Sequence, residues 1–494
     1  MISAIIITAC FIGILIFPFI SEANRAIVVF IGALISFFTL LIFEPGFLSP
    51  SFFNAIFNST FFIANIHSLI LILGMLFIIQ ICNSAGIFQF VAFRLIQKTK
   101  GRPLFLFLVF SSLAVLLGAI LNNITSVIIL IPLTIAVTRT LNINPTPYII
   151  SEAILANVGG VIFTISSVPN ILISMYAGIT FNEFFINVGL FSLFLFGFTT
   201  IFFLFYYRGK LMSSKKIKLE NLELFNAWNY VPNRNLFYKS LIILLSVLIC
   251  FIITPPILQF FSLSPNYISA DIIAICGAMI LVIISRLNVK EIIEKVDFEL
   301  MLFLLGIFFI TGAMQYTGII DIIDNGIAFL TGGNEFVAII LILWISSFLS
   351  TSVDNLPVTS TLMPIVGHFT TTAHMSGKSV YYSLIYGVNL GNNLILKADK
   401  VLALKMANQN KRTVTSSEFL KLSFIVTTLQ LIAVTLYFTL IYEFIYGLIV
   451  LVICLIILFL LIKWRLKKEK NGFNEDAMRP LEEEKAPIEE PTQV

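Results

Sequence analysis

Long apolar runs follow one another along most of the chain, and short polar stretches separate them. Runs of about 18 apolar residues or more are long enough to cross the hydrocarbon core of a membrane as α-helices. The pattern therefore predicts an all-α polytopic membrane protein. The runs lie at about 2–20, 26–43, 67–83, 103–140, 148–178, 186–206, 240–260 and 269–285, and the pattern restarts from residue 296.

Two of these runs contain polar residues at positions that a lipid-exposed helix does not tolerate. Asn122 and Asn123 stand in the middle of one run, and the next run is interrupted at 157–160 and again at 166–170. Unpaired polar groups in hydrocarbon cost several kcal/mol each, so these residues must face protein or a water-filled cavity. Glycine pairs and internal prolines also weaken a helix. We therefore predict helices that break inside the membrane.

The same interruptions return 232 positions later in the chain. Residue types that are scarce in lipid-facing helices share this register without a gap: Gly74 with Gly306, Gly86 with Gly318, Asn123 with Asn355, Pro132 with Pro364, Ser151 with Ser383, Asn157 with Asn389, and Gly159 with Gly391. This regularity predicts an internal duplication. The predicted domains are an N-terminal two-helix segment and loop (1–63), transporter repeat 1 (64–206), a cytoplasmic loop with two linking helices (207–295), transporter repeat 2 (296–440), a last transmembrane helix (441–462) and a disordered cytoplasmic tail (463–494).

The placement of basic residues indicates how the two copies are oriented. The basic cluster at 94–102 has no Lys or Arg in its counterpart at 326–334, and the cluster at 405–412 has none at 173–180. Basic loops mark the cytoplasmic side, so two inverted-topology repeats would give this asymmetry. We predict about eleven transmembrane helices plus two re-entrant hairpins in the cell membrane, with the N-terminus outside and the C-terminus cytoplasmic.

Composition narrows the functional class further. Hydrophobic residues make up 59% of the chain and charged residues 11%, and the mean hydropathy is +1.01. These values exclude a soluble protein, so we expect the lipid bilayer and not a nucleic acid as the surroundings of the chain. The spans show no nucleophile–base set and no metal-ligand cluster, so we expect neither an enzyme nor a cofactor or metal. A nucleotide-binding loop is also missing, so an ion gradient or a separate ATPase must supply energy.

Candidate chemistry lies at the predicted interruptions. A broken helix leaves backbone N–H groups free at one end and C=O groups free at the other; the first attract anions and the second coordinate cations. An asparagine amide can do either, and interrupted helices in inverted repeats indicate a transporter binding site. The residues that we expect to bind substrate or ion are Asn122, Asn123, Thr125, Asn157, Gly159, Gly160, Ser166, Ser167, Asn170, Asp354, Asn355, Asn389, Asn392, Asn393, Lys397 and Asp399.

The motifs at the interruptions resemble one branch of the ion transporter superfamily. This branch includes arsenite permeases, NhaD-type sodium/proton antiporters, the melanosomal P protein and citrate-type carriers. Residues 121–127 are similar to its Leu-Asp-Asn-x-Thr-Thr-Val hairpin, and residues 353–357 are similar to its Leu-Asp-Asn-Val-Pro hairpin. Residues 157–160 and 387–393 resemble its helix breaks. The resemblance covers about three fifths of the chain and implies a homodimer.

Departures from the branch's motifs bear on the transported ion. Asn122 and Ser167 stand where the branch carries aspartates that sodium/proton exchange would use. Asp354 remains as the clearest acid in the hairpins, with Glu152 and Asp399 as further candidates.

Two lysines add positive charge at or near the second break. One hypothesis is that Lys397 or Lys400 occupies a cation position, or pairs with Asp354 or Asp399. The alternative is a lysine that reaches the cytoplasmic surface from the end of a helix. We weigh the two equally for Lys397 and favour the surface for Lys400.

The function that we expect is secondary-active transport of a small inorganic or carboxylate ion by alternating access, with sodium or protons as the candidate coupling ion. The resemblance leans to an arsenite-permease-like anion carrier or a sodium/proton antiporter. A citrate-type dicarboxylate carrier is a further alternative. An ion channel, or a sensor that has lost transport, is the rival from another class.

Overall fold

The computed structural model describes residues 2–20, 25–44, 60–99, 102–141, 143–212, 227–264, 267–372, 377–394, 398–409, 415–449 and 451. All secondary structure in these segments is helical. The chain forms two compact units, Met1–Val434 and Thr435–Val494. The packing and the site described below lie in the first unit.

The protein is an all-helical polytopic membrane protein, as the sequence predicts. Nine helices in the described segments are long and apolar enough to cross a membrane, compared with about eleven predicted crossings. Others that the prediction counts are shorter: Ala270–Ser285 has 16 residues. Helix length does not separate spanning helices from the arms of re-entrant hairpins, so the two hairpins stay a prediction.

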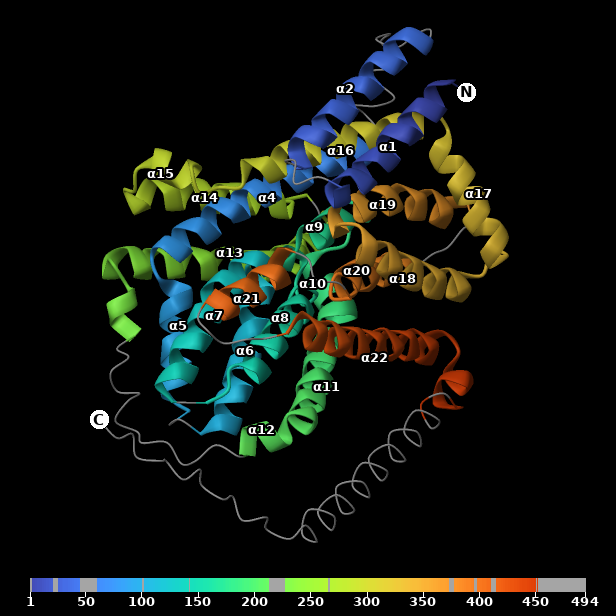
Figure 1. Ribbon diagram of the computed structural model, residues 1–494. Helices are drawn as coiled ribbons and strands as arrows, with labels where there is room; N and C mark the ends of the chain where they lie inside the picture. The colour runs from blue at the N-terminus through green and yellow to red at the C-terminus, as the bar shows by residue number, and fades with distance from the viewer. Residues whose placement is uncertain are drawn as a thin grey trace, which may run out of the picture. The chain divides into compact units, whose positions relative to one another are not determined.

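Two series of helices follow one another along the chain, and the main helices of one have counterparts in the same order in the other (Figure 1). The first comprises α4 (Thr60–Ser84), α5 (Ile87–Gln97), α6 (Pro103–Ile120), α7 (Asn123–Thr140), α8 (Thr146–Gly159), η1 (Thr164–Ser166), α9 (Val168–Tyr176), α10 (Phe181–Phe184), η2 (Phe185–Gly189) and α11 (Leu190–Tyr206). The second comprises α16 (Phe298–Tyr316), α17 (Ile319–Thr331), α18 (Glu335–Ser352), α19 (Asn355–Thr372), α20 (Ser379–Gly391), α21 (Ala398–Gln409) and α22 (Ser416–Tyr442).

The bounds of the two series follow the register of the sequence repeat. Helices α5 and α17, α6 and α18, and α7 and α19 each begin 232 positions apart. Where one domain ends and the next begins stays a prediction.

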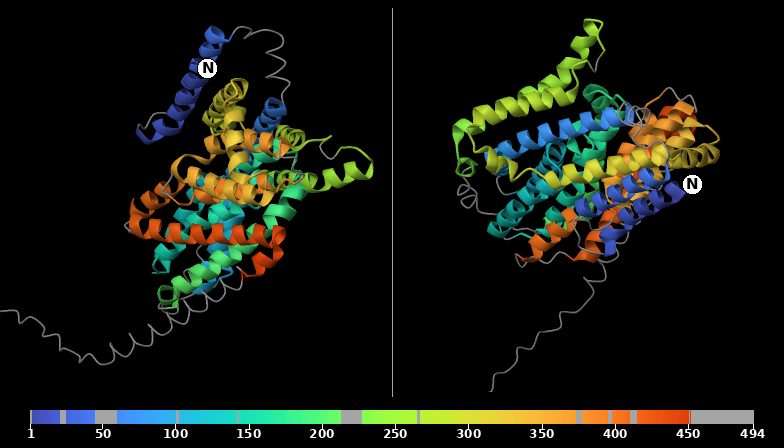
Figure 2. Two further views of the ribbon diagram at one scale, coloured as in Figure 1. Left: turned by 90° about the vertical axis from the view of Figure 1, so that its right-hand side faces the viewer. Right: turned by 90° about the horizontal axis from the view of Figure 1, so that it is seen from above.

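The remaining helices flank the two series. They are α1 (Ile2–Ile20), α2 (Arg25–Phe43), α12 (Arg208–Met212), η4 (Ala227–Tyr230), α13 (Arg234–Phe260), α14 (Ala270–Ser285) and α15 (Val289–Ile293). Helix α2 packs between α1 and α16, and α4 packs against α9, α13, α14 and α16 (Figures 1 and 2).

Helix α4 begins at Thr60, seven residues before the predicted span at about 67. The seven residues before the predicted start include the polar Thr60 and Asn65, so hydropathy alone places the start later. Two polar residues within the predicted span have partners in the structure: Ser68 Oγ donates to the carbonyl of Ala64 (2.7 Å), and His67 pairs with Asp271 of α14.

Small residues bring two pairs of helices into backbone contact. A Cβ on Gly159 of α8 would collide with the carbonyl of Val115 in α6, and one on Gly391 of α20 would collide with the carbonyl of Ser347 in α18. These positions correspond across the 232-residue offset, so the same close approach is built twice. It presses each interrupted helix, α8 or α20, against the first arm of a helix pair, α6 or α18.

Candidate functional site

The first helix pair breaks where the sequence predicts. Helix α6 ends at Ile120, α7 begins at Asn123, and Leu121 donates its backbone N–H to the carbonyl of Leu117 (2.7 Å). Asn122 caps α7, because its Oδ1 accepts the backbone N–H of Thr125 (2.8 Å). An asparagine N-cap satisfies one of the free donors of a helix start. Asn122 is exposed at this tip.

The next interruption separates α8 from α9, and we call it the first break. Side chains form hydrogen bonds with its free backbone groups. Asn170 Nδ2 donates to the carbonyls of Gly160 (2.8 Å) and Phe163 (3.0 Å). Ser166 Oγ donates to the carbonyl of Ala119 (2.7 Å) in α6. The hydroxyl of Ser167 is buried and has no hydrogen-bond partner among the described residues. The break is therefore a turn fixed by hydrogen bonds, and the Ser167 hydroxyl at its end has no partner among the described residues.

Asparagine side chains from both halves of the chain meet next to these breaks. Asn123 Nδ2 donates to Asn157 Oδ1, and Asn157 Nδ2 donates to Asn393 Oδ1. Ser423 Oγ of α22 donates to the carbonyl of Asn393. We call Asn123, Asn157 and Asn393 the asparagine chain. It runs from α7 through α8 to the residues just after α20, so it joins the two series.

A second amide pair crosses between the halves. Asn389 Nδ2 of α20 donates to Asn170 Oδ1 of α9 (2.8 Å) and to the carbonyl of Ile385 (2.8 Å). Both asparagines are buried: 0% of Asn170 and 3% of Asn389 is exposed. Five of the predicted site residues therefore lie in two hydrogen-bonded sets, the asparagine chain and this pair, and both sets join the two halves. Together we call them the amide network.

The tip of the second helix pair is acidic where the first is neutral. Helix α18 ends at Ser352 and α19 begins at Asn355. Asp354 Oδ1 accepts the backbone N–H of Asn355 (2.8 Å), and the carbonyl of Asn355 accepts a hydrogen bond from Thr359 Oγ1 (2.6 Å). Both predicted residues are partly buried at the N-terminus of α19.

The second break follows α20, and a buried lysine lies next to it at the start of α21. Lys400, in the first turn of α21, is 0% exposed, and its Nζ donates to the carbonyl of Asn392 (2.7 Å). The surface position that we favoured for Lys400 is therefore wrong, because this carbonyl offers a partner inside the protein. Lys397 lies outside the described residues. Asp399 lies in α21, but its side chain is outside the description.

A buried carboxyl group lies on the same helix as the central residue of the asparagine chain. Glu152 of α8 is 1% exposed, and its Oε1 accepts a hydrogen bond from Thr134 Oγ1 of α7 (2.6 Å). Its Oε2 has no partner among the described residues. Glu152 therefore ties α7 to α8 on the helix that also carries Asn157.

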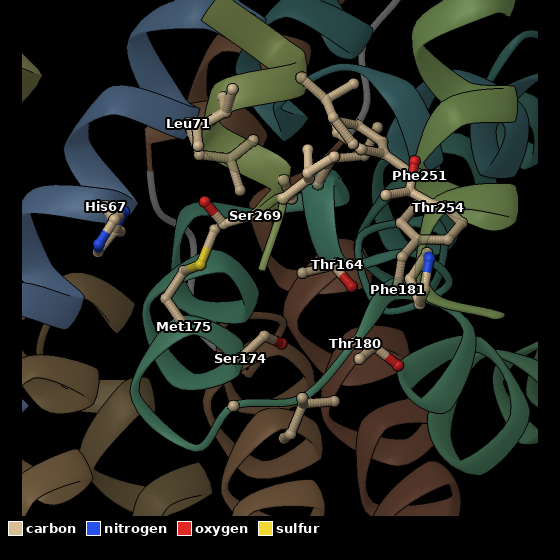
Figure 3. Close-up of a pocket in the computed structure, with 18 of the residues that line it drawn as sticks. His67, Leu71, Thr164, Ser174, Met175, Thr180, Phe181, Phe251, Thr254 and Ser269 are labelled. Carbon is tan, nitrogen blue, oxygen red and sulfur yellow. The ribbon is translucent and has the colours of Figure 1, made fainter. Parts of the chain in front are cut away.

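A cavity of about 430 Å³ lies beside the first break (Figure 3). One wall comes from α4, α13 and α14, and the other from η1, α9 and the start of α10. Most of the lining is apolar. The hydroxyls of Thr164 and Ser174 are exceptions, because both are buried in the lining without a hydrogen-bond partner among the described residues.

A histidine–carboxylate pair stands at this cavity. His67 Nδ1 lies 2.8 Å from Asp271 Oδ2; the ring is partly exposed and the carboxylate is buried. Neither His67 nor Thr164 belongs to a motif or spacing pattern. Only the place of Thr164 between the two predicted interruptions of its run could have indicated it.

An ion pair connects the two series near the cavity. Lys378 Nζ, just before α20, lies 2.9 Å from Glu183 Oε2 of α10 and donates to the carbonyl of Gly178 (2.9 Å). Tyr382 donates its hydroxyl to Glu183 Oε1 (2.9 Å). The sequence could not predict this contact, because nearly 200 residues separate its members.

Comparison with known proteins gives one family match. Residues 5–387 match the citrate transporter family (CitMHS). The matched stretch contains both helix-pair tips and the first break. It ends before Asn389, so the second break, with Asn392 and Lys400, lies outside it.

Individual relatives include transporters. The uncharacterized transporter Rv2685 of Mycobacterium tuberculosis is 28% identical over 371 residues, which are 74% of this chain and 84% of that protein. The 46 kDa membrane protein of Mycobacterium leprae is 27% identical over 373 residues, with the same shares. The P protein of Homo sapiens is 23% identical over 431 residues, which cover 72% of this chain and 51% of the P protein.

A solved structure shares the fold. The crystal structure of the YdaH transporter of Alcanivorax borkumensis superimposes with a TM-score of 0.60, over 81% of this chain and 90% of that chain. The sequence identity is 15%. At this identity the likeness concerns the arrangement of helices alone.

Proposed function

The chain belongs to the citrate transporter family (CitMHS), and from this premise we propose that it is a secondary-active carrier of small carboxylate anions that works by alternating access. It is a membrane transporter and not an enzyme. Within the superfamily predicted from the motifs, the family match favours the citrate-type alternative over the arsenite-permease-like carrier.

The observation that carries the proposal is the buried amide network between the two halves. Asn157 receives a hydrogen bond from one half and donates one to the other. Amides bind a carboxylate through their N–H groups without holding a competing negative charge. A site shared by two halves of a protein can open to either side of the membrane when the halves move relative to each other.

The charges around the site support an anionic substrate. Asn122 and Ser167 are neutral where sodium/proton exchange would need carboxylates, and Lys400 adds a buried positive charge close to Asn392. A buried ammonium attracts an anion strongly because the surrounding protein screens charge less than water does. This argument weighs against the sodium/proton antiporter.

We infer that the cavity at His67 is the route by which the substrate reaches the first break. Its lining includes Thr164, which lies three residues before the spare hydroxyl of Ser167. An apolar cavity with a few polar groups is the usual form of a small-molecule site. We further propose that the protein lies in the cell membrane as a homodimer. Its N-terminus would lie outside the cell and its C-terminus in the cytoplasm.

Flux in proteoliposomes with one imposed gradient at a time tests the function. Citrate, succinate and arsenite are offered in turn, with sodium, proton and no gradient. The proposal expects saturable uptake of at least one carboxylate that competes with others of its class. Uptake of arsenite alone would favour the arsenite-permease-like carrier, and sodium-driven proton movement without any anion would favour the antiporter. Binding without flux would identify a sensor.

A further inference from the structure

We propose that the ammonium group of Lys400 is a built-in cation at the second helix break. It takes the position of the dissolved cation that a carrier with a neutral residue at position 400 would bind. The inference rests on the proposed function, in which the two breaks belong to one transport site. It predicts that this half of the site needs no dissolved cation.

Lys400 contacts a carbonyl of the kind that binds cations, at the end of a helix. Its Nζ lies 2.7 Å from the carbonyl of Asn392, which follows the last residue of α20, Gly391. Carbonyls at the end of a helix have no partner inside the helix and carry the negative end of its dipole. In transporters with interrupted helices, such carbonyls help to coordinate the coupling cation.

Helix stability does not explain this lysine. Lys400 is the third residue of α21, and a positive charge in the first turn of a helix is unfavourable because the dipole is positive there. A buried charge also costs several kcal/mol unless partners compensate it. The side chain is nevertheless 0% exposed, whereas Lys405 on the same helix is exposed. Burial therefore distinguishes Lys400 from Lys405, and its ammonium group has a partner inside the protein, the carbonyl of Asn392.

In the first half of the chain, a neutral group binds the corresponding carbonyl. The counterpart of Asn392 is Gly160, 232 positions earlier, and its carbonyl accepts a hydrogen bond from Asn170 Nδ2 (2.8 Å). The counterpart of Asn170 is Leu402, which has no polar group. The corresponding carbonyl is therefore bound by an amide in one half and by an ammonium in the other. The difference between the halves is one of charge, since a donor is present in both.

The charge acts next to the amide network. Asn393, which follows Asn392, accepts a hydrogen bond from Asn157, and α21 packs against α7 and α8. A fixed positive charge here lies beside the groups that the proposed carrier uses for its anion. Lys400 lies outside the stretch 5–387 that matches the family.

Thermal stability of the purified full-length protein tests the proposal without any substrate. Lys400→Ala is measured in choline chloride, and the choline is then replaced at constant ionic strength by sodium, potassium or methylammonium. We expect at least one small cation to raise the melting midpoint of Lys400→Ala by about 2 °C or more, since a bound ligand stabilises the folded state. The wild type and Lys405→Ala should not respond.

Two outcomes would overturn the proposal. One is a Lys400→Ala protein as stable as the wild type in every salt, and the other is a destabilised variant that no cation restores. If Lys400→Ala cannot be purified, Lys400→Gln decides, because glutamine keeps a donor for the Asn392 carbonyl without the charge. Its uptake should fall about tenfold or more while Lys405→Gln stays at the wild-type rate; wild-type uptake by Lys400→Gln would contradict the proposal. A wild type that transports nothing refutes the proposed function, but leaves the stability result interpretable.

Discussion

Asparagine suits the centre of this site because its amide is donor and acceptor at once. Asn157 accepts from Asn123 and donates to Asn393, so it relays hydrogen bonds across the protein without placing a charge in a region of low dielectric. A carboxylate at position 157 could accept both neighbours but could donate to neither. The sequence predicted these residues from their places at the helix interruptions and in the repeated motifs. It could not predict their pairing, since 236 positions separate Asn157 from Asn393.

Asn122→Asp tests whether the two helix-pair tips act together. Aspartate caps a helix as well as asparagine does, so the hydrogen bond to Thr125 should survive and the fold should not change. If the tips share one site, a second acid in addition to Asp354 should change how uptake depends on sodium or on pH. Asn122→Ser is the control, because it keeps a cap and adds no charge. Identical ion dependence in all three proteins would show that the tips act separately.

At the scale of the element, close backbone contacts hold the interrupted helices α8 and α20 in place. Gly159 lies against Val115, and Gly391 lies against Ser347. The helix starts at 87, 103 and 123 agree with their sequence counterparts because prolines, glycines and asparagines mark them. Helices α4 and α13 begin at Thr60 and Arg234, six or seven residues before the predicted spans at about 67 and 240, because apolar run length alone does not mark where a helix starts.

Gly159→Ala should destabilise the protein, although alanine is the better helix former. The added Cβ would collide with the Val115 carbonyl, and overpacking of this kind costs about 1–3 kcal/mol. Gly197→Ala in α11 is the matched control, because nothing lies within 4 Å of its Cβ position, and helix propensity alone should leave it unchanged or more stable. Melting midpoints of the two purified variants give the comparison. Equal midpoints would mean that α8 does not need the close contact.

Duplication organises the whole molecule. The family match and the shared fold with YdaH agree with the polytopic helical architecture that composition and run length predicted. The sequence could indicate two copies because rare residue types keep one register. It indicated the added lysines at the second break but placed Lys400 at the surface, because a lysine near a helix end can reach the membrane surface; in the structure Lys400 is buried.

Opposite orientation of the two copies predicts opposite accessibility at corresponding positions. Lys98, after α5, and Leu330, near the end of α17, are both exposed and lie 232 positions apart. In a chain whose native cysteines are replaced by serine, Lys98→Cys should react with a membrane-impermeant maleimide only after the cells are opened. Leu330→Cys should react in intact cells. Labelling of both from the same side would rule out inverted repeats.

The central claim is that the asparagine chain forms the site of a carboxylate carrier, and citrate counterflow tests it most directly. Proteoliposomes loaded with unlabelled citrate are diluted into a trace of labelled citrate, without any ion gradient. We predict transient accumulation of label by the wild type. We also predict about tenfold less by Asn157→Ala, because the variant loses the amide that joins Asn123 to Asn393 in the proposed site. No counterflow by the wild type with citrate or any other carboxylate, or counterflow undiminished in Asn157→Ala, would contradict the account.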